Sequence, residues 1–230
     1  MTLTIIDTFG FLFTNYYALP YLKTSNGTPT GMITGFMNFI SNLGRDYKTN
    51  YILFSLDSKG KSFRNEIYSE YKANRSEPPE ELLTQLPIAL NLIKEMGFHS
   101  IEKEGYESDD IIASITTIVK QQGIKVIIVT HDKDMYQLVD DDKVLIFDPR
   151  KKILINEEEV IKKFGVKPTD FTNFQAILGD SSDNVPGIKG IGLKGGAKLI
   201  NQYHTLENIY QNIDEIKGAV KKRIIEGKEK

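Results

Sequence analysis

ESDDIIASITTIVKQQGIKVIIVTHDKD, residues 107–134, combines a helical pattern, a strand pattern and five acids. Its first half carries apolar residues at helical spacing, and Gly123 then ends the expected helix. The run from Ile124 to Thr130 follows and reads as a buried strand. This stretch therefore predicts a helix that leads directly into a strand of a central sheet.

Carboxylates stand at both ends of this stretch. Glu107, Asp109 and Asp110 lie where the helix begins. Asp132 and Asp134 follow the strand, at the carboxyl edge where open parallel sheets place their ligands. The alternative interpretation is that Asp109 caps the helix while the other acids are solvated.

Two further strands favour a shared site at that edge. The apolar-rich runs 2–6 and 51–56 end at Asp7 and Asp57, and residues 30–43 between them show one apolar helical face. A strand–helix–strand unit of this kind predicts a parallel pair, and hence an α/β fold. A lone aspartate after a strand is usually a turn residue. Several at one sheet edge repel each other unless cations compensate them, so we infer divalent metal.

The available ligands indicate which metal. The chain has no Cys, and His99, His131 and His204 show no paired metal spacing, which disfavours zinc. The later acids Asp180 and Asp183 add to an excess of carboxylates, which suits Mg²⁺ or Mn²⁺. More acids than one octahedral ion can use predict two ions. Two-metal carboxylate clusters typically catalyse in-line displacement at phosphorus, with the ions roughly 4 Å apart.

Three motifs resemble signature blocks of the bacterial 5′ nuclease, or flap endonuclease, family. They read GYESDD at 105–110, THDKDMYQL at 130–138 and GDSSDNVPG at 179–187. That family includes the N-terminal 5′–3′ exonuclease domain of DNA polymerase I and related phage enzymes. The resemblance runs in the same order from Asp7 to about Gly227.

The resemblance implies a fold and a domain organisation. The expected fold is the PIN-like 5′ nuclease fold, with a mostly parallel central sheet flanked by helices, a helical arch and a helix–three-turn–helix element. Residues 1–165 would form the nuclease core, with the helical gateway and arch at about 58–86. Residues 166–230 would form the helix–three-turn–helix subdomain and the C-terminal helices.

Cations interleaved with aromatic residues follow the second strand, over residues 57–75. This pattern is typical of a path for single-stranded nucleic acid, although a solvated helix face with core-packed aromatics explains it equally well. The resemblance implies that Lys72 and Arg75 belong to the gateway and stabilise the phosphoryl transition state. Further DNA contacts in this segment are expected at Lys59, Arg64 and Tyr71.

A glycine-rich turn, GIKGIGLKGGAK at 187–198, opens a later helix. Backbone N–H groups in such a turn can approach a phosphate, although glycine turns before helices are common. The resemblance implies that the turn grips duplex DNA through its phosphates, commonly with a bound K⁺, so binding would depend on salt and little on sequence. The expected contacts are Gly187, Lys189, Gly190, Gly192 and Lys194.

The predicted function is that of a structure-specific 5′ nuclease, both exonuclease and flap endonuclease, in DNA replication and repair. Its substrates would be flapped, nicked or 5′-ended DNA and RNA–DNA primer junctions. Two Mg²⁺ or Mn²⁺ ions would activate water for in-line attack. The first ion is assigned to Asp7, Asp57, Glu107 and Asp109, and the second to Asp132, Asp134, Asp180 and Asp183, with Asp110 close to both.

Composition is compatible with this function. The 230 residues, 40% hydrophobic, can bury a sizeable core. The net charge of −2 combines 29 basic with 31 acidic residues, and many of the acids are assigned to the metals. No long apolar run or signal peptide is visible, and the absence of Cys favours an intracellular site, so we expect a cytoplasmic monomer without membrane contact.

Two other functions are compatible with parts of the pattern. A PIN-like ribonuclease could use a similar acidic sheet edge, but it would not need the gateway or the glycine–lysine turn. A binding module could hold branched DNA without cutting it, although loss of some of the acids would then be expected.

Two local predictions are less specific. The helix from Leu82 to Met96 is expected to be interrupted or restarted at Pro87. In the aromatic run 11–17, Tyr16 or Tyr17 either stacks on a base or packs in the core.

Overall fold

The computed structural model describes residues 1–19, 22–46 and 49–228, without the side chains of residues 44–46. It divides into two compact units. The core unit comprises Met1–Phe63, Ser76–Met135 and Asp141–Leu154, and the helical unit comprises Arg64–Arg75, Tyr136–Asp140 and Ile155–Lys230. No helix in the described part of the chain is long and apolar enough to cross a membrane.

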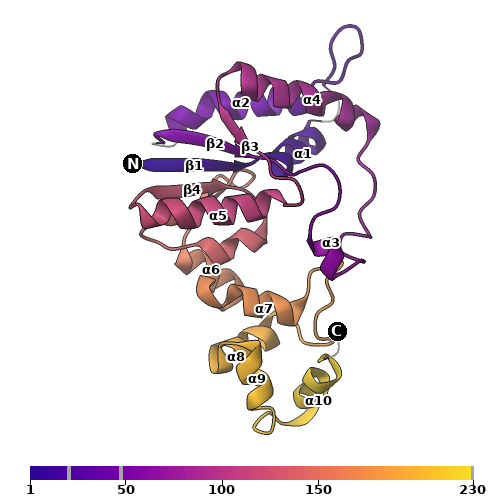
Figure 1. Ribbon diagram of the computed structural model, residues 1–230, viewed down its shortest axis with the longest axis vertical. Helices are drawn as coiled ribbons and strands as arrows, with labels where there is room; N and C mark the ends of the chain where they lie inside the picture. Colours follow the sequence, from indigo (N-terminus) through magenta and orange to yellow (C-terminus); the bar gives the residue numbers. More distant parts are fainter. Residues whose placement is uncertain (20–21, 47–48, 229–230) are drawn as a thin grey trace. The chain divides into compact units, whose positions relative to one another are not determined.

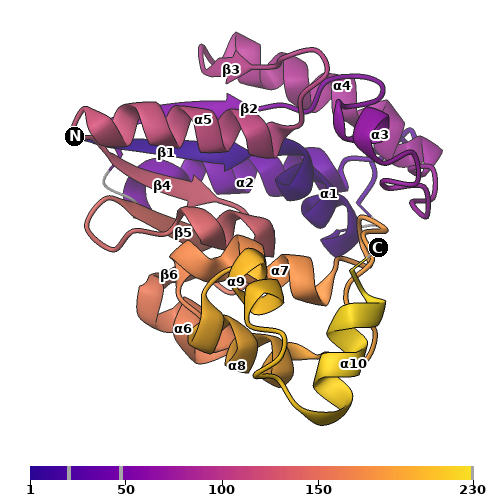
Figure 2. The same ribbon diagram turned by 60° about the horizontal axis from the view of Figure 1, so that its bottom comes forward.

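A six-stranded sheet of order β3-β2-β1-β4-β5-β6 forms the framework of the core unit; Figure 1 labels β1 to β4, and Figure 2 labels β5 and β6 as well. The strands are β1 (Thr2–Asp7), β2 (Tyr51–Ser55), β3 (His99–Ile101), β4 (Lys125–Val129), β5 (Val144–Asp148) and β6 (Ile153–Ile155). The first five pair in parallel. Parallel neighbours need a crossover of about a dozen residues, so β6, which follows β5 after a short turn, runs antiparallel. The prediction of a mostly parallel sheet is confirmed.

Helices cover both faces of this sheet. Figure 2 shows α5 (Ser108–Gln121) lying across β1, β2 and β4 on one face. On the other face pack α1 (Thr8–Ala18), α2 (Gly31–Asp46) and α4 (Glu80–Glu95), with α2 and α4 side by side (Figure 1). Together with the strands they enclose a core that includes the fully buried Ile6, Phe36 and Phe54.

Helix α1 is absent from the sequence prediction because its aromatic run gave no clear helical period. Tyr16 packs in the core, whereas 63% of the Tyr17 side chain is exposed. A Cβ at Gly31 would collide with the Leu19 carbonyl oxygen, and one at Gly35 would collide with the Asn15 amide. The two glycines therefore let α1 and α2 approach closely.

Helix α4 runs without a break through Pro87, so the predicted interruption is wrong. Pro87 cannot donate a hydrogen bond to the carbonyl of Leu83, four residues earlier. Both residues are exposed, so water can satisfy that carbonyl and the helix continues.

The helical unit is built around a ring cluster of Tyr136, Phe164, Phe171 and Phe174. Helix α8 packs against α6, α7 and α9. The side chain of Asn156 accepts a hydrogen bond from the Glu159 N–H and so caps the start of α6. The helices are α3 (Arg64–Ile67), α6 (Glu157–Phe164), α7 (Phe171–Leu178), α8 (Leu193–Tyr203), α9 (Leu206–Gln211) and α10 (Gly218–Glu226), with the 3-10 helix η2 (Pro168–Asp170). A further 3-10 helix, η1 (Lys133–Leu138), begins in the core unit and ends in the helical unit.

Gln85, which is buried, links α4 to the first turn of α2. Its Oε1 accepts a hydrogen bond of 3.0 Å from the Met32 N–H, and its Nε2 donates one of 3.1 Å to the Glu81 carbonyl. Gln85 therefore satisfies a helix N-terminal donor that is buried away from water.

We expect Gln85→Ala to lower the free energy of unfolding by about 1–3 kcal/mol, because it leaves the Met32 N–H buried without an acceptor. Urea unfolding monitored by circular dichroism measures the change. The matched control is Gln121→Ala at the exposed end of α5, which should shift stability by less than about 0.5 kcal/mol. Equal effects of the two substitutions would contradict the role of Gln85.

Candidate active site

Asp7, at the end of β1, is the most buried of the predicted site acids, with 8% of its surface exposed. Its Oδ2 accepts a hydrogen bond of 2.9 Å from the Thr130 hydroxyl. The first turn of α1 also approaches closely, since a Cβ at Gly10 would lie 2.6 Å from the same oxygen. Gly10 and Thr130 therefore hold the carboxylate in place.

The acids after β4 are ordered by the same threonine. The Thr130 Oγ1 accepts a hydrogen bond of 3.0 Å from the Asp132 N–H. The Asp132 Oδ1 in turn accepts one of 2.9 Å from the Asp134 N–H. Both aspartates are half-buried. A chain of hydrogen bonds thus connects the carboxyl ends of β1 and β4.

Asp57 and the acids at the start of α5 also accept hydrogen bonds from backbone N–H groups. The Asp57 Oδ1 accepts a hydrogen bond of 2.8 Å from the Ser108 N–H. Glu107 is the N-cap residue and forms a capping box with Asp110, whose Oδ2 accepts the Glu107 N–H at 3.0 Å. Asp109 lies half-buried in the first turn, so the alternative that Asp109 caps the helix is wrong. Each carboxylate used in this way keeps further acceptor capacity.

Asp7, Asp57 and Asp132 lie near enough to each other for the charges of Asp57 and Asp132 to act on Asp7. The pKa of Asp7 is raised to about 6, first by burial and then by the negative charges of Asp57 and Asp132. Hydrogen bonds from Thr130 and from the Gly10 backbone lower it in part. A bound cation would relieve this repulsion and favour the ionised carboxylates.

The donor set fits a hard divalent cation on an open edge. All the candidate ligands of the core unit are carboxylates, which suit Mg²⁺ or Mn²⁺. In the described residues no group of three or more His, Cys, Asp or Glu side chains is close enough to enclose an ion. The edge is therefore an open arrangement, in which water and phosphate oxygens would complete the coordination of an ion.

In the helical unit, Asp183 lies beside both predicted gateway cations, Lys72 and Arg75. Its Oδ1 lies 2.6 Å from Arg75 Nη2, and its Oδ2 lies 3.9 Å from Lys72 Nζ. The Tyr71 hydroxyl donates to the same Oδ2 at 3.0 Å. The gateway segment, residues 64–75, is thus tied to the acidic loop, residues 179–187.

Backbone contacts strengthen this link. The Lys72 N–H donates to the Asp183 carbonyl at 2.9 Å, and Lys72 adopts a φ of 57°, a left-handed conformation that costs free energy in a non-glycine residue. Asn74 donates to the Ser181 carbonyl and Asn184 to the Glu70 carbonyl, each at 2.7 Å. Sequence reasoning missed both asparagines, because no local pattern reveals partners so distant in the chain.

The gateway is less helical than predicted. Between residues 58 and 79 the described chain contains only one short helix, α3, followed by turns. Pro78 and Pro79 and the strained Lys72 explain why helix does not continue there. Lys59 is exposed and Arg64 half-buried. Tyr71 is buried and its hydroxyl donates to Asp183, so it supports its neighbours.

The glycine–lysine turn joins α7 to α8 in the helical unit. Gly192 is the N-cap of α8, and a Cβ there would meet nothing within 4 Å, so the backbone is open to a ligand. Gly187, in the acidic loop, packs against Leu178 and Gly179. Lys189, Gly190 and Lys194 are exposed.

Arg223 of α10 braces this turn and was not predicted. Its Nη1 donates a hydrogen bond of 2.8 Å to the carbonyl of Gly190, which has a φ of 84°. The sequence around Arg223 shows only a basic C-terminal helix, so a contact with a residue 33 positions away could not be predicted.

The predicted site residues thus form two groups. The core unit brings the acids of β1, β2, β4 and α5 to one sheet edge. The helical unit places Asp183 beside the gateway cations, and Asp180 lies in the same loop, where its Oδ1 accepts the Ser182 N–H at 2.8 Å.

Two family models match the chain end to end. One, described as "5′–3′ exonuclease, N-terminal resolvase-like domain", matches residues 2–165. The other, described as "5′–3′ exonuclease, C-terminal SAM fold", matches residues 166–230. The chain belongs to the 5′–3′ exonuclease family. The predicted class of enzyme, a 5′–3′ exonuclease, is confirmed.

Relatives of this 5′–3′ exonuclease family member include separate exonucleases and parts of polymerases. It is 39% identical to the "5′–3′ exonuclease" of Buchnera aphidicola subsp. Acyrthosiphon pisum, covering 93% of this chain and 75% of that one. It is 38% identical to the "DNA polymerase I" of Caldicellulosiruptor bescii, covering 100% of this chain but only 28% of that one.

Among solved structures, the bacteriophage T5 flap endonuclease, described as a complex with DNA and metal ions, superposes with a TM-score of 0.81. The two chains are 26% identical, and the match covers 98% of this chain and 83% of that one. The predicted 5′ nuclease fold is therefore confirmed.

The raised pKa of Asp7 predicts a pH dependence of the metal-free protein. Because the folded-state pKa lies above the unfolded value, the contribution of Asp7 to stability is complete below pH of about 4 and is lost as pH rises through about 6. Asp7→Asn, measured in EDTA by urea unfolding, should remove this loss and stabilise the protein at pH 7 by about 2–3 kcal/mol.

The matched control is Asp142→Asn, which removes an exposed carboxylate. If Asp7→Asn and the wild type showed the same dependence of unfolding free energy on pH, the burial and repulsion of Asp7 would be refuted.

Proposed function

We propose that this chain hydrolyses phosphodiesters in flapped, nicked or 5′-ended DNA as a structure-specific 5′ nuclease with two divalent ions, Mg²⁺ or Mn²⁺. The supporting observation is the row of carboxylates that β1, β2, β4 and α5 deliver to one sheet edge. The T5 flap endonuclease, described with DNA and metal ions, supports both kinds of ligand.

The proposed metal ligands are the acids assigned from the sequence. Divalent ions at this edge would supply charge compensation and an activated water for in-line attack on phosphorus. Asp7, Asp57, Glu107 and Asp109 would hold the first ion, and Asp132, Asp134, Asp180 and Asp183 the second, with Asp110 near both. Thr130 would keep Asp7 and Asp132 in their positions through its two hydrogen bonds.

Lys72 and Arg75 are the proposed electrophilic groups. Both reach the Asp183 carboxylate, so Asp183 determines where the two positive charges stand. A phosphate drawn to this place would find two cations aimed at its oxygens, and these would stabilise the negative charge that develops during attack.

The glycine–lysine turn is the proposed grip on duplex DNA. The N-terminus of α8 carries no acid in its first turn, and the exposed Lys189 and Lys194 flank the open backbone at Gly192. This arrangement favours phosphate binding without base contacts. We include a K⁺ ion in the turn, RNA–DNA primer junctions as substrates, a monomeric state and a cytoplasmic location in the proposal.

The decisive test is cleavage of a 5′-labelled double-flap DNA. With Mg²⁺ the wild type should cut near the junction, and EDTA should abolish cutting. Asp132→Ala/Asp134→Ala should reduce the rate by at least about a hundredfold, because it removes two of the proposed ligands of the second ion. Gel electrophoresis of the products gives the rates, and filter binding verifies that the variant still holds DNA.

Asp141→Ala/Asp142→Ala, an equal change of charge in the exposed turn before β5, serves as the matched control and should cut normally. Faster cutting of single-stranded RNA than of the flap would favour a ribonuclease. Tight DNA binding without any cutting by the wild type would favour a non-cleaving binding module.

A further inference from the structure

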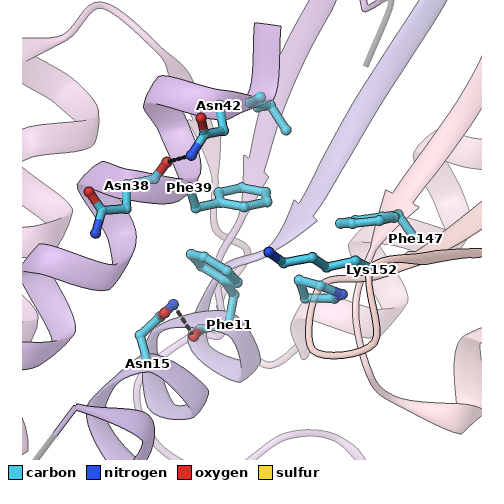
Figure 3. Close-up of a pocket in the computed structure, with 9 residues that line it drawn as sticks. Phe11, Asn15, Asn38, Phe39, Asn42, Phe147 and Lys152 are labelled. Carbon is cyan, nitrogen blue, oxygen red and sulfur yellow. Dashed lines mark hydrogen bonds between the residues drawn. The ribbon is translucent and has the colours of Figure 1, made fainter. Parts of the chain in front are cut away.

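The core unit contains a pocket of about 450 Å³ that none of the proposed catalytic residues lines. It lies between α1, α2 and the turn after β5, as Figure 3 shows. This volume is within the range of about 300–1,000 Å³ typical of small-molecule sites. The lining residues are Phe11, Asn15, Asn38, Phe39, Asn42, Leu43, Phe147, Pro149 and Lys152.

Aromatic rings form the apolar part of this pocket. The rings of Phe11 and Phe39 pack against each other with centroids 4.2 Å apart, and Phe147 stands on the opposite side in Figure 3. Phe11 and Phe147 are buried in the core and Phe39 is half-buried, so these walls are rigid. Rigid rings with a partly open face suit a flat aromatic ligand.

The polar part of the pocket consists of amides and one cation. Asn15 donates to the Phe11 carbonyl and packs its oxygen against Gly35, whereas Asn42 donates to the Asn38 carbonyl and keeps its oxygen as an acceptor. The Asn38 amide and the Lys152 ammonium make no hydrogen bond or ion pair with any residue that the structure describes. They are therefore available to a ligand.

Lys152 is placed by the backbone to face the pocket. It has a φ of 55°, and its N–H donates to the Asp148 carbonyl at 2.8 Å, closing the turn between β5 and β6. Figure 3 shows its side chain extending toward the rings of Phe11 and Phe39. None of the lining residues is acidic, so the pocket favours a ligand with negative charge at this point.

We infer that this pocket binds a nucleoside 5′-monophosphate. The base would lie against the Phe39 and Phe147 rings, the asparagine amides would contact its polar edge, and Lys152 would pair with the phosphate. The choice of a nucleotide rests on the nuclease function proposed above, since a 5′–3′ exonuclease releases this class of product.

The position of the pocket supports a reaction product as its ligand. Phe11 lies four residues after Asp7 in the chain, about one turn along α1 from the acidic edge. A mononucleotide that leaves this edge meets the pocket within the same unit. The fraction of protein with an occupied pocket would then depend on the concentration of product near the acidic edge.

Calorimetric titration of dAMP into the metal-free protein in EDTA tests the inference independently of cleavage. We expect saturable binding at one site, and about tenfold weaker binding to Lys152→Gln, because the charged hydrogen bond to phosphate is lost. Deoxyadenosine, which lacks the phosphate, should bind the wild type about as weakly as dAMP binds the variant.

Two pairs of variants distinguish binding in the pocket from a general effect of protein charge on dAMP binding. Lys151→Gln removes the neighbouring cation, which points to Asp148 and does not line the pocket, and should bind dAMP like the wild type. Asn38→Asp places a negative charge in the lining and should weaken binding about tenfold or more, whereas Ser41→Asp adds the same charge elsewhere on α2 and should not.

Absence of dAMP binding to the wild type, or equal binding to Lys152→Gln and Lys151→Gln, would overturn the inference. A short single strand such as a thymidine tetranucleotide is the other source of the same chemistry. If it bound more tightly than dAMP and depended more strongly on Lys152, the pocket would hold a strand end and the assignment to free product would be wrong. Because no cleavage is measured, these outcomes are separate from a failure of the nuclease activity.

Discussion

A buried carboxylate at the end of the central strand constrains the rest of the core unit. Asp7 is enclosed by α1, hydrogen-bonded to Thr130 and repelled by the charges of Asp57 and Asp132, so that its pKa is raised to about 6. A structure that only needed stability would replace such a group by an apolar one, since burial of a charge without compensation is costly. The parallel sheet makes this crowding unavoidable, because it delivers the ends of β1, β2 and β4 to one edge.

The same acids also build the local structure around them. Asp57, Glu107 and Asp110 satisfy backbone N–H groups at the start of α5, and Asp132 closes the turn after β4. These bonds hold the carboxylates in fixed orientations and leave lone pairs directed elsewhere. One set of residues therefore combines these structural roles with the metal binding that we propose.

Much of the fold and of the acidic edge could be predicted from the sequence, because both depend on local patterns. Apolar runs followed by Asp7, Asp57 and Asp132 mark strand ends, and the helical period before Gly123 marks α5. The contacts between distant residues could not be predicted. Thr130 and Asp7 are 123 positions apart, and the contact of Arg223 with Gly190 likewise depends on tertiary packing. Helix α1 and the unbroken α4 follow from packing and solvent exposure, which override the local signals.

The proposed metal site can be tested by diffraction from crystals of the protein with a flap DNA and Mn²⁺, recorded near the manganese absorption edge. We expect two anomalous peaks, roughly 4 Å apart, at the carboxyl ends of β1, β2 and β4, with Asp7, Asp57 and Asp132 among the ligands. Manganese bound only elsewhere, with DNA in place and this edge free of metal, would contradict it.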